Sequence, residues 1–153
     1  MKRSQRILVL GLSLVFALLA TQAFAADFKP KAEYTMQVNV GPLYDWGIGA
    51  QRWADLVKEK TGGKVNVKPY FGSSLLAGKQ TNWFQAVADG AIDFAVESTI
   101  NASATIPALN LFNLPFFMPS YDAVDKIENG KSGQMVIDAM EKGGIKFLAW
   151  GEN

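Results

Sequence analysis

A group of polar side chains follows an apolar stretch of the sequence and supplies the groups that hold a small polar solute. Glu97, Ser98 and Asn101 come directly after residues 91–96, which are apolar apart from Asp93. Hydroxyl and amide groups donate and accept hydrogen bonds, and a carboxylate accepts them. A carboxylate on a buried strand is costly unless it is paired or faces a cleft, which makes Glu97 the most informative member. Turn and capping roles explain Ser98 and Asn101 equally well.

Two neutral polar residues occupy comparable positions elsewhere in the chain. Asn39 lies near the end of the first predicted strand, and Gln80 begins the helix after the second. In open α/β sheets, ligands bind at the carboxyl ends of the strands. We therefore expect Asn39, Gln80 and Glu97 to offer hydrogen bonds to one polar solute, with no metal and no cofactor.

Enzyme chemistry is the alternative, and the composition restricts it. The chain has no His and no Cys, which excludes a Ser-His-Asp triad, a cysteine nucleophile, a cysteine zinc site and a His-ligated haem within it. Residues 130–132 resemble the end of a phosphate-binding loop but lack its first glycine. Asp89 and Asp93 flank Gly90, where solvated turn acids are the simpler interpretation. An exported α/β enzyme that uses Asp93 or Glu97 with a lysine is the runner-up hypothesis.

Hydrophobic periodicity indicates the elements that position these residues. Strands alternate with helices four times, which predicts an α/β fold with a mostly parallel sheet. Gly47 and Gly49 fall inside the first helix, where small residues permit close packing. The predicted strands are residues 34–40, 65–71, 91–97 and 145–150, and the predicted helices are residues 46–61, 79–88, 121–128 and 133–142.

The amino-terminal residues have the three parts of a secretory signal peptide. Lys2, Arg3 and Arg6 precede an apolar run over residues 7–20, and Ala23-Phe24-Ala25 forms a cleavage site. We expect residues 1–25 to be removed and residues 26–153 to form the exported domain. The chain has 15 Lys and Arg against 14 Asp and Glu, so loss of the three basic residues leaves a net charge of −2. This charge argues against a nucleic-acid partner.

The order of three segments resembles a known family. Residues 83–94 read WFQAVADGAIDF, residues 109–117 read LNLFNLPFF, and residues 144–153 read GIKFLAWGEN. Together, behind a signal peptide, they are similar to the solute-binding subunits of TRAP transporters, the DctP family.

The resemblance implies a periplasmic protein that captures a small organic acid, a carboxylate, and delivers it to membrane permease subunits. It implies one lobe of a periplasmic-binding-protein-like fold, with the chain ending before the second lobe and before the arginine that usually grips the carboxylate. By position, Asn39, Gln80 and Glu97 fall where family members place polar contacts. Asn153, the last residue of the third segment, is the remaining candidate ligand-binding residue. Many members carry an acidic residue where Gln80 stands, so the solute is expected to differ from theirs.

Overall fold

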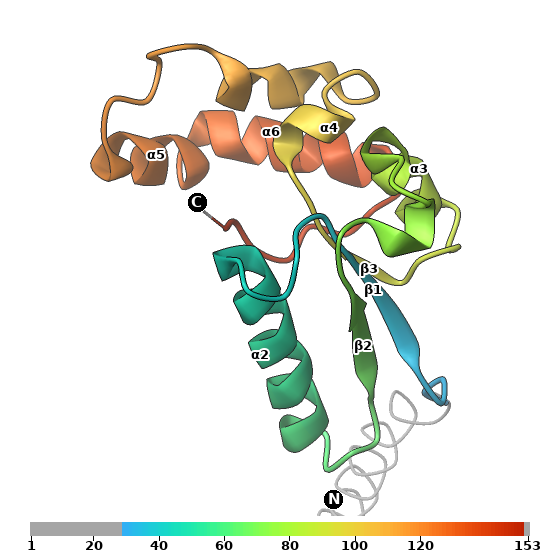
Figure 1. Cartoon of the computed structure of the whole chain (residues 1–153). Coiled ribbons are helices and arrows are strands. Elements are labelled where there is room, and N and C mark those ends of the chain that lie inside the picture. Colours follow the sequence, from blue (N-terminus) through green and yellow to red (C-terminus); the bar gives the residue numbers. More distant parts are fainter. Residues whose placement is uncertain (1–28, 152–153) are drawn as a thin grey trace, which may run out of the picture. The chain divides into compact units, whose positions relative to one another are not determined.

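A three-stranded parallel sheet forms the centre of the chain. The computed structural model describes residues 29–151, and the chain divides into two compact units, residues 1–30 and 31–153. The second unit is described here. Its strands are β1 (Tyr34–Val38), β2 (Val67–Tyr70) and β3 (Phe94–Val96), in the order β2-β1-β3 (Figure 1). Residue Tyr34 pairs with Val67, and Met36 with Phe94.

Helix α2 (Asp45–Lys60) covers one face of this sheet. Met36, Val38 and Ala50 are buried between the helix and the sheet, and the rings of Trp53 and Phe94 meet edge to face with centroids 5.2 Å apart. The close packing predicted from the glycines is confirmed at one of them. A Cβ on Gly47 would lie 2.2 Å from the carbonyl oxygen of Gly41, whereas a Cβ on Gly49 would meet nothing within 4 Å.

The helices that carry a second apolar cluster lie beyond the carboxyl ends of the strands (Figure 1). Its fully buried centre is formed by Phe84, Leu109 and Val136, which come from three different elements. These elements and their neighbours are α3 (Trp83–Ala88), α4 (Thr99–Ala102), the 3₁₀ segment η3 (Pro107–Asn113), α5 (Tyr121–Glu128) and α6 (Lys131–Lys142).

Most predicted elements match the structure to within two residues at their ends, and three differ more. The helix expected over residues 79–88 is a 3₁₀ turn, η2 (Gln80–Asn82), followed by α3. Strand β3 begins late because the backbone N–H groups of Ala91 and Ile92 donate to the carbonyl of Ala86, at the end of α3, and not to a neighbouring strand.

The fourth strand, predicted over residues 145–150, is absent, and that prediction was wrong. Ile145, Phe147 and Trp150 are half-buried and pack against the second apolar cluster. The rings of Phe112 and Trp150 have centroids 4.9 Å apart. No described strand pairs with this segment, so side-chain packing and not sheet hydrogen bonding holds it in place.

Within residues 29–151, no helix is long and apolar enough to cross a membrane. The predicted signal peptide, residues 1–25, lies outside the described residues.

Candidate functional site

The sheet has one apolar face and one polar face. Side chains alternate along a strand, so Met36 and Val38 point to α2 while Gln37 and Asn39 point to the opposite side. Because Gln37 pairs with Ala95, Glu97 falls on this polar side, just past the end of β3. Two strand ends therefore bring an amide pair and a carboxylate to one edge of the sheet.

The loop after β2 folds over the end of β1. The backbone N–H of Gly72 donates to the carbonyl of Val40 at 3.0 Å, and that of Ser73 donates to Val38 at 3.1 Å. Both Gly72 and Ser73 have positive φ, 66° and 56°. This left-handed conformation is costly for Ser73, and its complete burial and two partners hold it there.

This loop orients both amides of β1. The backbone N–H of Leu75 donates to Gln37 Oε1 at 3.1 Å, and the Ser73 hydroxyl donates to Asn39 Oδ1 at 3.2 Å. Since each amide oxygen is occupied by the loop, each amide nitrogen faces elsewhere. Gln37 Nε2 makes a long hydrogen bond to the carbonyl of Val38, 3.4 Å, and also acts on the Glu97 carboxylate, while no hydrogen bond from Asn39 Nδ2 is found within residues 29–151.

Glu97 stands beside these amides without a partner. The backbone N–H of Asn39 donates to the carbonyl of Val96 at 3.0 Å, which extends the β1–β3 pairing to the residue before Glu97. Both carboxylate oxygens of Glu97 are buried, and within the described chain neither accepts a hydrogen bond. Burial raises the pKa of Glu97 to about 7. The Gln37 amide and the Ser98 backbone N–H lie close to the carboxylate and lower its pKa, but by less than burial raises it.

The other predicted site residues lie at different distances from this group. Ser98 precedes α4, and its side chain does not cap that helix. Asn101 is half-buried on α4, and Gln80 is exposed in η2. In the part of the chain that the structure describes, no hydrogen bond joins Gln80 to Asn39 or Glu97. Asn153 lies outside the described residues.

Sequence reasoning missed two members of the group, Gln37 and Ser73. Both are fully buried polar residues. A signal for Gln37 was present, because it stands two residues before Asn39 and therefore shares its face of the strand. Ser73 follows a glycine in the loop after β2, and only the fold places it against β1.

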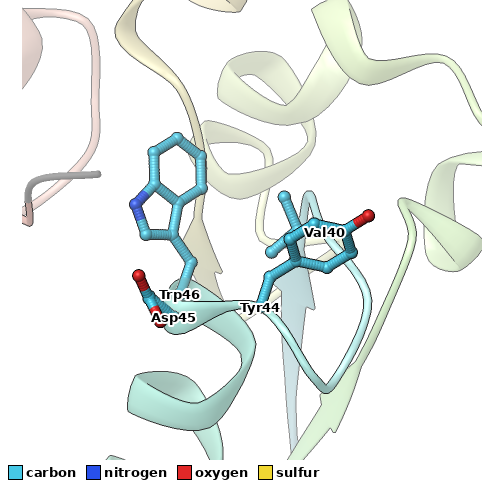
Figure 2. Close-up of a pocket in the computed structure, with 4 residues that line it drawn as sticks. All are labelled: Val40, Tyr44, Asp45 and Trp46. Atoms are coloured by element: carbon cyan, nitrogen blue, oxygen red, sulfur yellow. The ribbon is translucent and has the colours of Figure 1, made fainter.

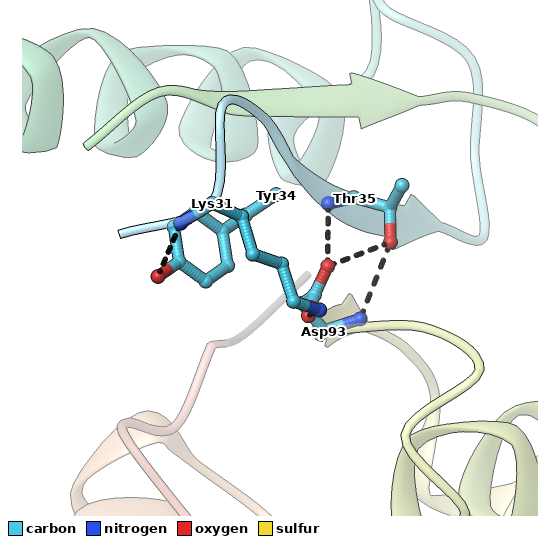
Figure 3. A network of polar contacts seen from close by, with 4 residues as sticks. All are labelled: Lys31, Tyr34, Thr35 and Asp93. Atoms are coloured by element: carbon cyan, nitrogen blue, oxygen red, sulfur yellow. Dashed lines mark hydrogen bonds and ion pairs between the residues drawn. The ribbon is translucent and has the colours of Figure 1, made fainter. Parts of the chain in front are cut away.

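At the opposite end of the sheet, Asp93 has a structural role (Figure 3). Its carboxylate accepts hydrogen bonds from the backbone N–H and hydroxyl of Thr35, at 2.9 and 3.2 Å, and pairs with Lys31. Burial alone would raise the pKa of Asp93, but the contacts with Lys31 and Thr35 outweigh it and lower the pKa. Asp93 is thus a bonded link between β1 and β3, and its interpretation as a solvated turn acid was wrong.

An open depression lies next to the end of β1, lined by Val40, Tyr44, Asp45 and Trp46 (Figure 2). Its empty volume of about 280 Å³ includes open solvent. Among residues 29–151, no group of three or more acidic side chains is placed to hold a metal ion.

Comparison with known proteins identifies the family. Residues 36–153 match the family described as bacterial extracellular solute-binding protein, family 7, or DctP. The chain belongs to this family.

Solved structures of DctP-family proteins share the fold. The chain is similar to a TRAP periplasmic solute-binding protein from Ralstonia eutropha H16 with bound (S)-2-acetolactate, at 50% identity and a TM-score of 0.78 over 80% of this chain and 39% of that one. It also resembles such a protein from Sulfurospirillum deleyianum with bound succinate, at 28% identity and a TM-score of 0.68 over 77% of this chain and 37% of that one. The predicted α/β lobe with a parallel sheet is confirmed.

A curated DctP-type relative gives the same result from sequence. The C4-dicarboxylate-binding protein DctB of Bacillus subtilis is 32% identical over 107 residues, which are 70% of this chain and 30% of DctB. The chain spans about a third of the length of the curated relatives it matches. These homologues are solute-binding components of transport systems, and several are named as periplasmic.

Proposed function

We propose that this protein is the periplasmic solute-binding component of a TRAP-type transporter, which captures a small organic acid and delivers it to membrane permease subunits. The observation that supports this most directly is Glu97, a buried carboxylate without a partner, beside two amides whose nitrogens are turned away from the loop that holds them. This group stands at the carboxyl edge of a parallel sheet, where α/β proteins place ligands.

The proposed contacts fall into two sets. Asn39 and Glu97, with the newly found Gln37, form the centre of the site on β1 and β3. Ser98 and Asn101 on the α4 side, Gln80 and Asn153 are proposed as peripheral contacts. Neutral donors and one carboxylate fix a solute by hydrogen bonds without converting it, which favours binding over catalysis.

The proposal is tested by calorimetry on the complete product of the reading frame. (S)-2-acetolactate and succinate, the solutes of the two solved relatives, are the first probes. We expect saturable one-to-one binding with the solute recovered unchanged, and weaker binding when Asn39→Ala is introduced. Conversion of the solute into product would overturn the proposal in favour of the enzyme. Absence of binding by small carboxylates up to millimolar concentration would also overturn it.

A further inference from the structure

The surroundings of Glu97 are polar but uncharged. The Gln37 amide of β1 and the Ser98 backbone before α4 act on it directly, and Asn39 and Ser73 lie at the same edge of the sheet. No charged side chain of residues 29–151 contributes to the shift in the pKa of Glu97. Nothing in the described part of the chain therefore neutralises this carboxylate when it is ionised.

The group offers a mixed set of hydrogen bonds to a solute. Asn39 Nδ2 donates, and the two oxygens of Glu97 accept. The Glu97 side chain as a whole is half-buried while both carboxylate oxygens are buried, so a solute reaches them only when the side chain turns about its own bonds. A buried acceptor without a donor is costly, so binding gains most from a solute that brings an O–H group to this point.

A second carboxylate on the solute has the opposite effect. It brings no donor, and it places a negative charge next to Glu97 in a partly buried setting where solvent screens poorly. The first carboxylate of the solute must then bind away from Glu97, where amide or other donors are available.

We propose that Glu97 determines specificity by accepting a hydrogen bond from a solute hydroxyl group, so that the protein selects hydroxylated monocarboxylates over dicarboxylates. This inference rests on the proposed solute-binding function and goes further by naming the solute class. It assigns to this chain a preference for solutes that carry a hydroxyl group near the carboxylate, and weaker binding of succinate-like solutes when Glu97 is ionised.

Two matched four-carbon acids, erythronate and succinate, and the five-carbon (S)-2-acetolactate test the proposal. Erythronate carries hydroxyl groups and ends in an alcohol where succinate ends in a second carboxylate. Calorimetry at pH 8 on the complete product of the reading frame measures the dissociation constant of each acid. The value for succinate is compared with the value for erythronate or (S)-2-acetolactate, whichever binds more tightly. We expect the hydroxylated acid to bind at least about tenfold more tightly, as a charge-assisted hydrogen bond implies.

The Glu97→Gln variant isolates the role of the charge. Its amide still accepts from a hydroxyl and also donates to a carboxylate, so we expect the preference to fall below about threefold, mainly through a gain in succinate affinity. The matched control is Glu59→Gln, which removes an exposed carboxylate on α2 and should leave the preference unchanged. Circular dichroism confirms that both variants are folded.

A pH series adds a second readout. In the wild-type protein, protonation of Glu97 below pH 7 should raise succinate affinity between pH 8 and pH 6. The same series on Glu97→Gln corrects for the titration of succinate itself. An equal preference in wild type and Glu97→Gln, or tighter wild-type binding of succinate at pH 8, would overturn this inference and leave the proposed function standing. Failure of all three acids to bind would instead overturn the proposed function.

Discussion

Replacing Glu97 by glutamine should stabilise the folded protein at neutral and alkaline pH. The folded environment raises the pKa of Glu97 from 4.5 to about 7, which means that ionised Glu97 destabilises the fold. One pKa unit corresponds to about 1.4 kcal/mol, so the full rise corresponds to roughly 3 kcal/mol. Solvent that reaches the rest of this half-buried side chain screens the charge, and we expect about 1–2 kcal/mol at pH 8.

The pH dependence has a definite sign. The native protein holds the Glu97 proton more tightly than the unfolded chain does, so the stability of the wild type should fall as pH rises from about 4.5 to about 7. Below pH 4.5 both states are protonated, and the difference between wild type and Glu97→Gln should disappear. Asp93, whose pKa is lowered, loses its contribution only as pH falls below its ordinary value of 3.8, outside this window.

Urea unfolding at pH 4.5, 6 and 8, followed by circular dichroism, measures the effect. Glu59→Gln on the exposed side of α2 serves as the matched control and should follow the wild-type curve at every pH. If Glu97→Gln were less stable than wild type at pH 8, the carboxylate would have a bonded partner in solution. Glu97 would then not be an unpartnered buried carboxylate.

Three further substitutions test the packing and the polar contacts by the same unfolding assay. Gly133→Ala should destabilise by about 1–3 kcal/mol, because its Cβ would lie 2.0 Å from a backbone carbonyl oxygen of α5. Gly49→Ala, in open space on α2, is its control and should be neutral or stabilising by up to about 1 kcal/mol. Asp93→Asn should lower the free energy of unfolding by about 1–2 kcal/mol at pH 7, because the hydrogen bonds between β1 and β3 become weaker. A decrease of less than about 0.3 kcal/mol would contradict this structural role. Gln37→Leu should cost about 1–3 kcal/mol by leaving the Leu75 N–H without its acceptor, and an unchanged unfolding midpoint would refute that contact.

Local pattern in the sequence was sufficient for much of the fold. The period of two in residues 34–38 and the helical spacing of Trp46, Ala50 and Trp53 predicted β1 and α2, and the predicted helix over residues 121–128 coincides with α5. These features depend on residues a few positions apart, so their physical cause is contained in the sequence itself. Glu97 was likewise recognisable, since a carboxylate at the end of an apolar strand is costly wherever it lies.

Only the tertiary structure decided which residues meet. Gln37 and Ser73 become partners of the site because the loop after β2 returns over β1, joining residues more than thirty positions apart. Residues 145–150 were predicted to form a strand but make none, because a strand also requires a neighbouring backbone with unpaired N–H and carbonyl groups. The periodicity of apolar side chains shows which residues of one segment are buried, and it can be read from that segment alone. Hydrogen bonding in a sheet requires two segments, so it is determined only when the chain folds.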